Sequence, residues 1–166
     1  MKIRYRWTPS AALPLKSPDR PPVKRLIRRA AELAGLPVGE DWMAVVHFVG
    51  ARVMARANSD YVGHAGATDV ITFSYFDDPA SRFPGDVAAE LLICLDVAAK
   101  EGAKRADSSF AEELALYILH GFLHAAGYDD LAPETRRAMR RAERRGMAKL
   151  RAEFELCAVF PEKIKH

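Results

Sequence analysis

Cysteine is scarce in this sequence: among 166 residues only Cys94 and Cys157 are cysteines, and they lack Cys-x-x-Cys spacing. We expect both to be buried, reduced thiols, as in a cytoplasmic protein. Long apolar runs are also missing. No stretch approaches about 18 uninterrupted apolar residues, and the opening MKIRYRWTPS has no apolar segment of the kind found in signal peptides. The sequence therefore predicts a soluble, cytoplasmic protein that does not enter a membrane.

A strong excess of one charge is absent too. The formal net charge is +3, from 25 Lys and Arg against 22 Asp and Glu, so any basic surface must be local. Hydrophobic residues make up 49% and charged residues 28%, a balance typical of a soluble protein with a sizeable core. The length predicts a single domain over residues 1–166. The proline-rich segment 8–22 is predicted to be a loop within that domain.

Hydrophobic patterning predicts four strands, at residues 2–7, 42–49, 68–76 and 85–96. The first alternates apolar and basic residues, which indicates a half-buried strand with a basic outer face. The second, WMAVVHFV, is an almost continuous apolar run and predicts a strand that is covered on both faces. We interpret His47 within this run as a core histidine with a satisfied hydrogen bond, not as a ligand.

Helical spacing predicts five helices, over residues 23–36, 51–58, about 96–105, about 109–127 and about 133–156. In the second of these we expect Val53 and Ala57 to face inward. Ser108 or Ser109 is expected to cap the fourth, with Glu112 completing a capping box after Ser109. This fourth helix is apolar nearly all round, so it should be central. The order of elements predicts an α/β (α+β) fold, a small mixed sheet packed by about five helices.

The most informative stretch is HGFLHAAGYDD, residues 120–130. His120 and His124 stand four residues apart, so on a helix their rings share one face and can converge on a metal ion. Gly127 is a natural stop for that helix. The chain can then turn back and bring Asp129 or Asp130 beneath the rings. Two imidazoles and one carboxylate form an open ligand set for zinc, with water in the fourth place.

The same stretch argues against one common type of metal hydrolase. In HExxH metalloproteases a glutamate follows the first histidine and acts as the general base. Gly121 occupies that position here. A peptidase of that type is therefore disfavoured.

The spacing closely resembles the motif HGxLHxxGYDH of the YbeY family, the bacterial rRNA-maturation endoribonucleases. The family's stretch N-x-x-Y-R-x-x-x-x-P-T-D-V-L-S-F is similar to NSDYVGHAGATDVITF at residues 58–73, and its G-D-I element is similar to GDV at residues 85–87. Met139 and Glu143 match a Met and a Glu on the family's last helix. The resemblance spans roughly residues 45–150, with the motifs in the family's order.

This resemblance implies a single α/β domain that binds one zinc ion per chain through three side chains on and after a central helix. It also implies cleavage of single-stranded RNA, 16S rRNA 3′-end maturation and ribosome quality control, with the small ribosomal subunit as partner and no role for DNA. By position, His120 and His124 match the first two ligands. Asp130 stands where the family has a third histidine. A zinc-bound water on these residues would either attack the phosphodiester or help to activate the attacking group.

Two departures from the family pattern bear on activity. Aspartate is an acceptable zinc ligand, but its negative charge should make the centre polarise water less strongly. The family's proposed catalytic arginine is replaced by Val62. The candidates to supply the lost contact to a phosphate are Arg56, His64 and Arg82.

Several readings stay open at this point. The leading hypothesis is a zinc-dependent endoribonuclease acting on rRNA. The alternative is a ribosome-assembly or RNA-binding factor with weak or no catalysis, which Val62 and Asp130 favour. A hydrolase of another substrate, such as a peptide, is a weaker third option. Asp86 and Glu113 could support the metal ligands or have purely structural roles.

Overall fold

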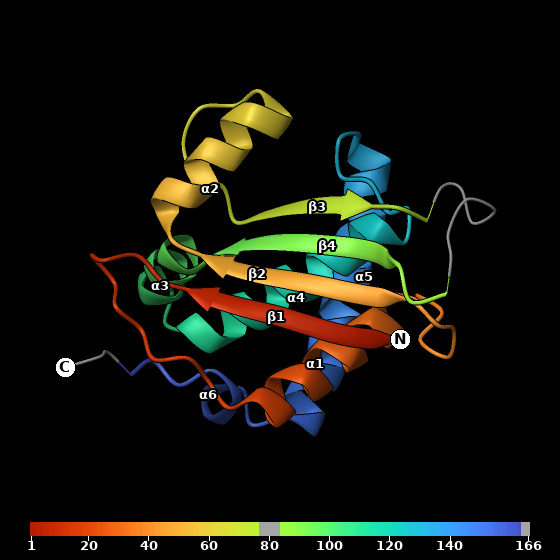
Figure 1. Ribbon diagram of the computed structural model, residues 1–166, viewed down its shortest axis with the longest axis horizontal. Coiled ribbons are helices and arrows are strands. Elements are labelled where there is room, and N and C mark those ends of the chain that lie inside the picture. The colour runs from red at the N-terminus through yellow and green to blue at the C-terminus, as the bar shows by residue number, and fades with distance from the viewer. Residues whose placement is uncertain (77–83, 164–166) are drawn as a thin grey trace.

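Four strands form one mixed sheet in the computed structural model, which describes residues 1–76 and 84–163. They are β1 (Lys2–Thr8), β2 (Met43–Val49), β3 (Val70–Ser74) and β4 (Val87–Cys94), in the spatial order β1-β2-β4-β3 (Figure 1). The pairs β1–β2 and β2–β4 are parallel, whereas β3 runs antiparallel to β4. The predicted small mixed sheet is confirmed.

The described residues also form six α-helices and one π-helical turn. They are α1 (Arg20–Leu33), α2 (Ala51–Ala57), η1 (Asn58–Val62), α3 (Leu95–Lys104), α4 (Phe110–Ala125), α5 (Pro133–Glu153) and α6 (Leu156–Val159). The α/β class and the predicted order of elements are confirmed. None of these helices combines the length and hydropathy that crossing a bilayer requires.

The short helix α6 was not predicted. The sequence predicts one helix that continues toward Leu156, but Phe154 adopts an extended conformation with φ −130° and ψ 137° and ends α5. The chain then turns so that Leu156, Val159 and Phe160 become buried. Packing against the core, including a stacked contact between Trp7 and Phe160 with ring centroids 6.5 Å apart, therefore outweighs the helical pattern.

Helix α4 is the central helix, as its apolar composition predicts. It contacts α1, α3, α5 and α6 as well as the strands β3 and β4, and Figure 1 shows it behind the sheet with α1 and α5. Its start is fixed by Ser109, whose hydroxyl accepts a hydrogen bond from the backbone N–H of Glu112 at 3.2 Å. A side chain at Gly102 would begin within 2.5 Å of the backbone of Ser109 and Phe110, so α3 and α4 approach closely there.

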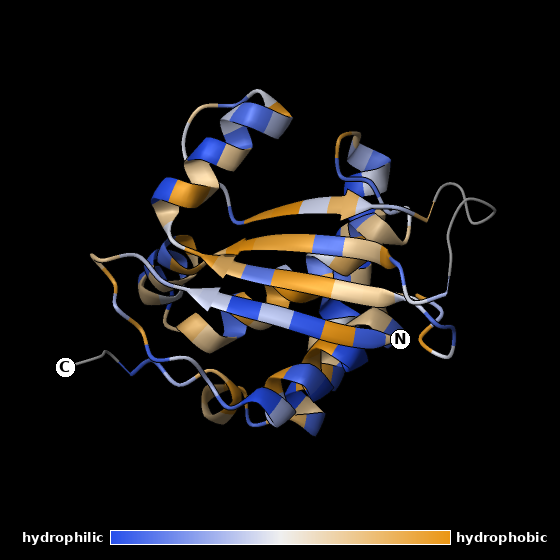
Figure 2. Cartoon of the chain, viewed as in Figure 1, coloured by the Kyte–Doolittle hydropathy of each residue, from blue (hydrophilic) through white to orange (hydrophobic). Residues whose placement is uncertain are grey.

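One prediction about the sheet was wrong, because β2 is covered on one face only. Its residues alternate between buried and half-buried, with Ala44, Val46 and Phe48 facing the helices. His47 lies on the open face, where its Nε2 is 2.8 Å from Oε1 of Glu90. The apolar run misled the prediction because half-exposed residues such as Val45 are apolar too, and Figure 2 shows hydrophobic β2 beside the mainly hydrophilic β1.

Two predictions about single residues were also wrong. Val53 is 49% exposed, and Met54 takes its place in a small core cluster with Val49 and Cys94, while Ala57 faces inward as expected. The helix α2 is rotated relative to the prediction because it packs on the end of the sheet rather than flat against it. Cys94 is a buried free thiol, but Cys157 is exposed on the short helix α6.

Candidate metal centre

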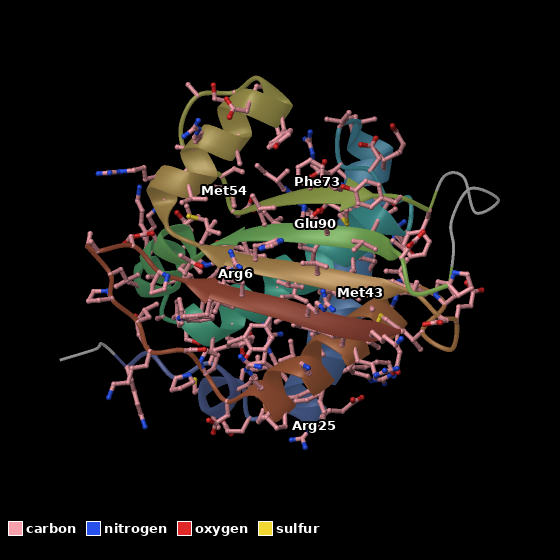
Figure 3. All side chains as sticks on the ribbon, in the orientation of Figure 1. Arg6, Arg25, Met43, Met54, Phe73 and Glu90 are labelled. Atoms are coloured by element: carbon pink, nitrogen blue, oxygen red, sulfur yellow. The ribbon has the colours of Figure 1, made fainter. Side chains whose placement is uncertain are left out.

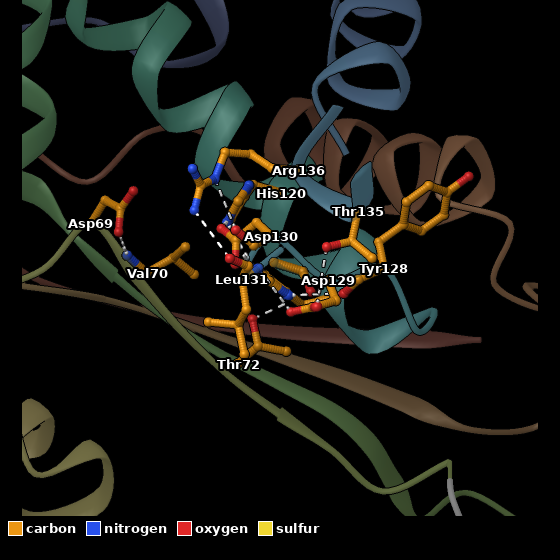
Figure 4. A network of polar contacts seen from close by, with 12 residues as sticks. Asp69, Val70, Thr72, His120, Tyr128, Asp129, Asp130, Leu131, Thr135 and Arg136 are labelled. Carbon is orange, nitrogen blue, oxygen red and sulfur yellow. Dashed lines mark hydrogen bonds and ion pairs between the residues drawn. The ribbon is translucent and has the colours of Figure 1, made fainter. Parts of the chain in front are cut away.

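The candidate site is built at the carboxyl-terminal end of α4. His120 and His124 lie one helical turn apart, so both rings leave the helix on the same side. The helix ends at Ala125, and Gly127 adopts a left-handed conformation with φ 94° that reverses the chain. The loop that follows brings Asp130 to the two rings (Figure 4).

The three side chains present their ligand atoms to one point. The Nε2 atoms of His120 and His124 lie 2.9 Å apart. The Oδ2 atom of Asp130 lies 3.8 Å from each of these nitrogens. Within residues 1–76 and 84–163 this is the one group of three or more His, Cys, Asp or Glu side chains with the spacing needed to hold a metal ion.

Each histidine is oriented by a partner on its other ring nitrogen. The Nδ1 of His120 is 2.5 Å from Oε1 of Glu143 on α5. The Nδ1 of His124 is 3.1 Å from the carbonyl oxygen of Tyr128. Both partners are acceptors, so both Nδ1 atoms carry hydrogen and each ring turns its Nε2 toward the site. This is the arrangement in which proteins commonly hold metal-binding histidines.

The arrangement favours a positive charge between the rings. Two Nε2 lone pairs at 2.9 Å repel each other unless a proton or a cation lies between them. Burial lowers the pKa of His120, but the hydrogen bond and charge of Glu143, together with the charges of Asp69 and Asp130, outweigh it and raise the pKa above its usual value. In the metal-free protein His120 therefore keeps its second proton up to a higher pH than an isolated histidine does.

The donor set fits a divalent transition metal. Tetrahedral zinc holds nitrogen and oxygen ligands at about 2.0–2.2 Å, which places the ligand atoms about 3.4 Å from one another. The observed spacings of 2.9 and 3.8 Å lie on either side of this value. Small side-chain movements would close the site around an ion and leave its fourth position open. Imidazole and carboxylate ligands also suit iron and manganese.

Asp129, the other aspartate of the turn, holds the loop instead. Its carboxylate accepts hydrogen bonds from the backbone N–H of Leu131 and from the hydroxyl of Thr135, both at 3.2 Å. Arg136 donates to the carbonyl oxygens of Asp130 at 3.0 Å and Leu131 at 3.2 Å. These contacts, drawn in Figure 4, fix the backbone of the turn and leave the carboxylate of Asp130 facing the histidines.

A hollow of about 370 Å³ adjoins the site beside His124. Its walls come from β3 and from the segment around η1, and they include Val62 and His64. The segment is anchored by Asn58, which is 5% exposed and donates a hydrogen bond from Nδ2 to the carbonyl oxygen of Gly66 at 2.9 Å. A linear substrate could therefore reach the metal ligands along this hollow.

The three candidate RNA contacts fall in different places. His64 lines the hollow, as does Val62 at the position of the family's arginine. Arg56 does not line it, and its Nε lies 3.7 Å from Oδ2 of Asp60 with the arginine side chain 87% exposed. Arg82 lies outside the described residues.

Glu113 does not support the metal ligands. Its side chain is buried, pairs with Arg105 and accepts a 2.6 Å hydrogen bond from the hydroxyl of Ser108. Its role is therefore to tie the loop before α4 to that helix. Asp86 lies just before β4, where its carbonyl oxygen accepts a 2.8 Å hydrogen bond from the backbone of Met43. The residue that does support a candidate ligand is Glu143, which contacts His120 and which the sequence indicates only by its match to the family.

Gly121, the residue after His120, packs closely against the sheet. A Cβ atom at this position would lie 2.8 Å from Cδ2 of Leu91 and 3.2 Å from Oγ1 of Thr72. The position faces the sheet rather than the metal site. A glutamate there would have to displace Leu91 or Thr72, which agrees with the argument against an HExxH mechanism.

Fold and site together define an α/β protein whose central helix and following loop present two imidazoles and a carboxylate to one point. A family model described as Endoribonuclease YbeY matches residues 16–151. The chain belongs to the YbeY family.

Individual relatives agree with this assignment. An Endoribonuclease YbeY of Chlorobaculum tepidum is 37% identical over 125 residues, which cover 73% of this chain and 86% of the relative. The protein of the same name from Aromatoleum aromaticum is 37% identical over 147 residues, or 89% of each chain. A solution structure from Thermotoga maritima is similar with a TM-score of 0.54 and 22% identity, covering 97% of this chain and 99% of the other. This last similarity supports the fold alone.

Proposed function

We propose that this chain is a metal-dependent endoribonuclease that cleaves single-stranded RNA during rRNA processing, in particular 16S rRNA 3′-end maturation and ribosome quality control. Family membership and the names of the relatives support the activity. The observation that carries the proposal is the convergence of His120, His124 and Asp130 beside an open hollow.

In this proposal the three ligands hold one zinc ion, which when bound supplies Lewis-acid polarisation of the reacting groups. Glu143 and the carbonyl of Tyr128 keep the two imidazole rings in the orientation that ligation needs. Asp130 brings a negative charge that a histidine would not. We therefore expect a weaker Lewis acid than a site with three neutral histidines.

The RNA strand would pass along the hollow beside His124. His64 is the described residue of the three candidates that lines this hollow, and its imidazole can donate a hydrogen bond to a phosphate oxygen. It would take part of the role of the family's arginine. The protein would act as a single domain over residues 1–166 in the cytoplasm, with the small ribosomal subunit as partner and without DNA or membrane.

A second candidate function is an RNA-binding ribosome-assembly factor with little catalysis. The observation that favours it is the position of Val62, an apolar side chain that is 45% exposed and lines the hollow where the family has its arginine. A guanidinium there would stabilise charge as it develops on the phosphate. Valine supplies neither a charge nor a hydrogen bond.

The first test combines metal analysis with RNA cleavage. The purified protein should carry about one zinc per chain and should cleave an end-labelled single-stranded RNA. The substitution His124→Ala should remove both the metal and the cleavage. Cleavage that survives His124→Ala, or a wild-type protein that neither takes up zinc nor cuts RNA, would contradict the endoribonuclease.

The substitution Val62→Arg separates the two candidates. For an endoribonuclease that is slowed by the missing arginine, Val62→Arg should raise kcat/KM by about tenfold or more. Val62→Gln, which adds length without charge, should not. If the wild-type protein binds RNA without cutting it, and Val62→Arg leaves it inactive, the binding factor is the better description.

A further inference from the structure

The face of the sheet that no helix covers is the most distinctive surface outside the metal centre. The helices α1, α4 and α5 lie behind the sheet, and the open face is turned toward the viewer in Figure 1. Arg6, Met43, Glu90 and Phe73 come from four different strands and appear on this face in Figure 3. Strand pairing aligns Arg4, Val45, Glu90 and Phe73 in one row across it.

Two hollows lie on this face. One of about 420 Å³ lies between the sheet and the helical segment formed by α2 and η1, and the other, of about 550 Å³, lies over β1 and β2. Arg6 and His47 line both hollows, so the two lie side by side on the sheet. We refer to these two neighbouring hollows together as the groove.

Aromatic side chains gather at one end of the groove. Tyr61 and Tyr75 are 71% and 47% exposed, although large apolar rings are usually covered. Phe73 lines the same hollow, and its ring meets that of Tyr61 edge-on with centroids 5.3 Å apart. Exposed rings on a sheet surface can stack on nucleic acid bases, as in other RNA-binding folds.

Positive charge gathers at the other end. The groove is lined there by Arg4, Arg6, Arg20 and Lys24. None of these four forms an ion pair with a carboxylate in the part of the chain that the structure describes. Glu90 is the single carboxylate among the described lining residues, and it is held by His47. These positively charged side chains can therefore bind a polyanion.

The aromatic end borders the metal centre. Tyr61 lines the groove and the next residue, Val62, lines the hollow beside His124. Likewise Phe73 and Tyr75 face the groove, while Ser74 between them faces the hollow. The edge strand β3 and the turn η1 thus form a wall shared by the groove and the hollow beside His124. An RNA strand that leaves the metal centre would therefore reach the aromatic rings next.

We propose that the open face of the sheet is the binding track for single-stranded RNA that extends from the metal centre. The bases stack on Tyr61, Phe73 and Tyr75 as the strand crosses β3. Its phosphates then pair with Arg6 and Arg4 along β1. This inference rests on the proposed endoribonuclease function, because the RNA on the track is the substrate of that reaction. It adds a binding path beyond the cleavage site.

The test measures binding and cleavage separately. The probe is a fluorescein-labelled single-stranded polyuridine of about 20 nucleotides, long enough to span the groove. Its affinity for the zinc-loaded protein is measured by fluorescence anisotropy, and the intact length of the RNA is checked afterwards on a gel. Single-turnover cleavage at saturating protein then gives the rate constant of the bound complex.

The informative substitutions are Arg6→Ala and Tyr75→Ala. Each should raise Kd by about fivefold or more, since one stacked base or phosphate contact contributes that much, and should leave the cleavage rate constant at saturation unchanged. The matched controls are Tyr75→Phe, which keeps the ring, and Arg145→Ala on α5, an exposed arginine on the opposite side of the sheet. Both controls should bind as the wild type does.

Ultraviolet crosslinking of the wild-type protein checks the result without relying on a variant. Crosslinked peptides should contain Tyr61, Phe73 or Tyr75. If Kd is unchanged in both Arg6→Ala and Tyr75→Ala, the proposed track is wrong. This is the result expected if a protein partner, and not RNA, binds the open face. Cleavage of RNA by the same protein would still support the proposed function. If the wild-type protein binds RNA but does not cut it, the endoribonuclease proposal is wrong. The Kd values of Arg6→Ala and Tyr75→Ala then still test the track. A wild-type protein that does not bind RNA overturns both.

Discussion

Glu143 holds His120 across two helices: Nδ1 of the histidine on α4 lies 2.5 Å from Oε1 of the glutamate on α5, although the two residues are 23 positions apart in the chain. The contact keeps hydrogen on Nδ1 and turns Nε2 toward His124 and Asp130. It couples the packing of the two helices to the geometry of the metal centre. A defect in the α4–α5 interface should therefore reach the site.

We expect Glu143→Gln to weaken zinc binding by about 10- to 100-fold, because removing a partner behind a histidine ligand has effects of this size. The same substitution should lower the pKa of His120, since the hydrogen bond and charge of Glu143 raise it. A zinc titration against a competing chelator and an NMR titration of the histidines measure the two effects. Glu134→Gln on the same helix, where the glutamate side chain is 77% exposed, is the control. Equal affinities for the wild type and Glu143→Gln would refute the role of Glu143.

The metal-free and zinc-bound proteins should depend on pH in opposite ways. The folded state raises the pKa of His120 above its unfolded value of about 6.5. Protonation of His120 therefore stabilises the metal-free fold below about pH 6.5, and this stabilisation is lost as the pH rises through the folded pKa. Zinc must displace that proton, so its affinity should rise over the same interval.

Thermal unfolding at about pH 6 and about pH 8, with chelator and with zinc, tests whether the stability of the metal-free fold and the affinity for zinc change with pH in opposite directions. The increase in Tm on adding zinc should be larger at the higher pH. In Glu143→Gln the difference between the two pH values should shrink. A zinc-induced increase that is larger at the lower pH would show that His120 is not the group that the ion displaces.

Gly121→Glu should destabilise the fold without creating a peptidase. The position faces Leu91 and Thr72, so the carboxylate would be buried without a partner, at a cost of about 3 kcal/mol or more. Gly39→Glu is the matched control, because a side chain there meets no atom within 4 Å. Denaturant unfolding of the two variants measures the difference. A Gly121→Glu protein as stable as Gly39→Glu would mean that position 121 opens toward solvent.

The sequence predicted those parts of the fold that depend on local spacing. The pairing of His120 with His124 follows from the helical period, and the cap at Ser109 follows from its own hydroxyl. The order of the strands and the face of β2 that stays open depend on packing between distant segments. For that reason an apolar strand such as β2 was expected to be covered twice, and His47 was placed in the core.

The candidate site shows the same division. Local spacing could bring either Asp129 or Asp130 to the histidines, and only the hydrogen bonds of Asp129 to Leu131 and Thr135 separate the two. The contact of Glu143 with His120 requires α5 to fold back on α4, which no short motif encodes. The choice of Asp130 over Asp129 and the contact of Glu143 with His120 therefore depend on the folded arrangement of the turn and of α5.

Asp130→His restores the histidine of the family and should strengthen the centre. A neutral imidazole removes the negative charge that Asp130 places 3.8 Å from both histidines, so a bound ion keeps more of its positive charge. We expect the cleavage rate, the zinc affinity or both to rise by a few-fold or more, measured by single-turnover cleavage and by chelator competition. Asp129→Asn is the control, because it perturbs the turn through Thr135 but removes no ligand. If Asp130→His leaves both quantities unchanged, Asp130 is not a ligand of the ion.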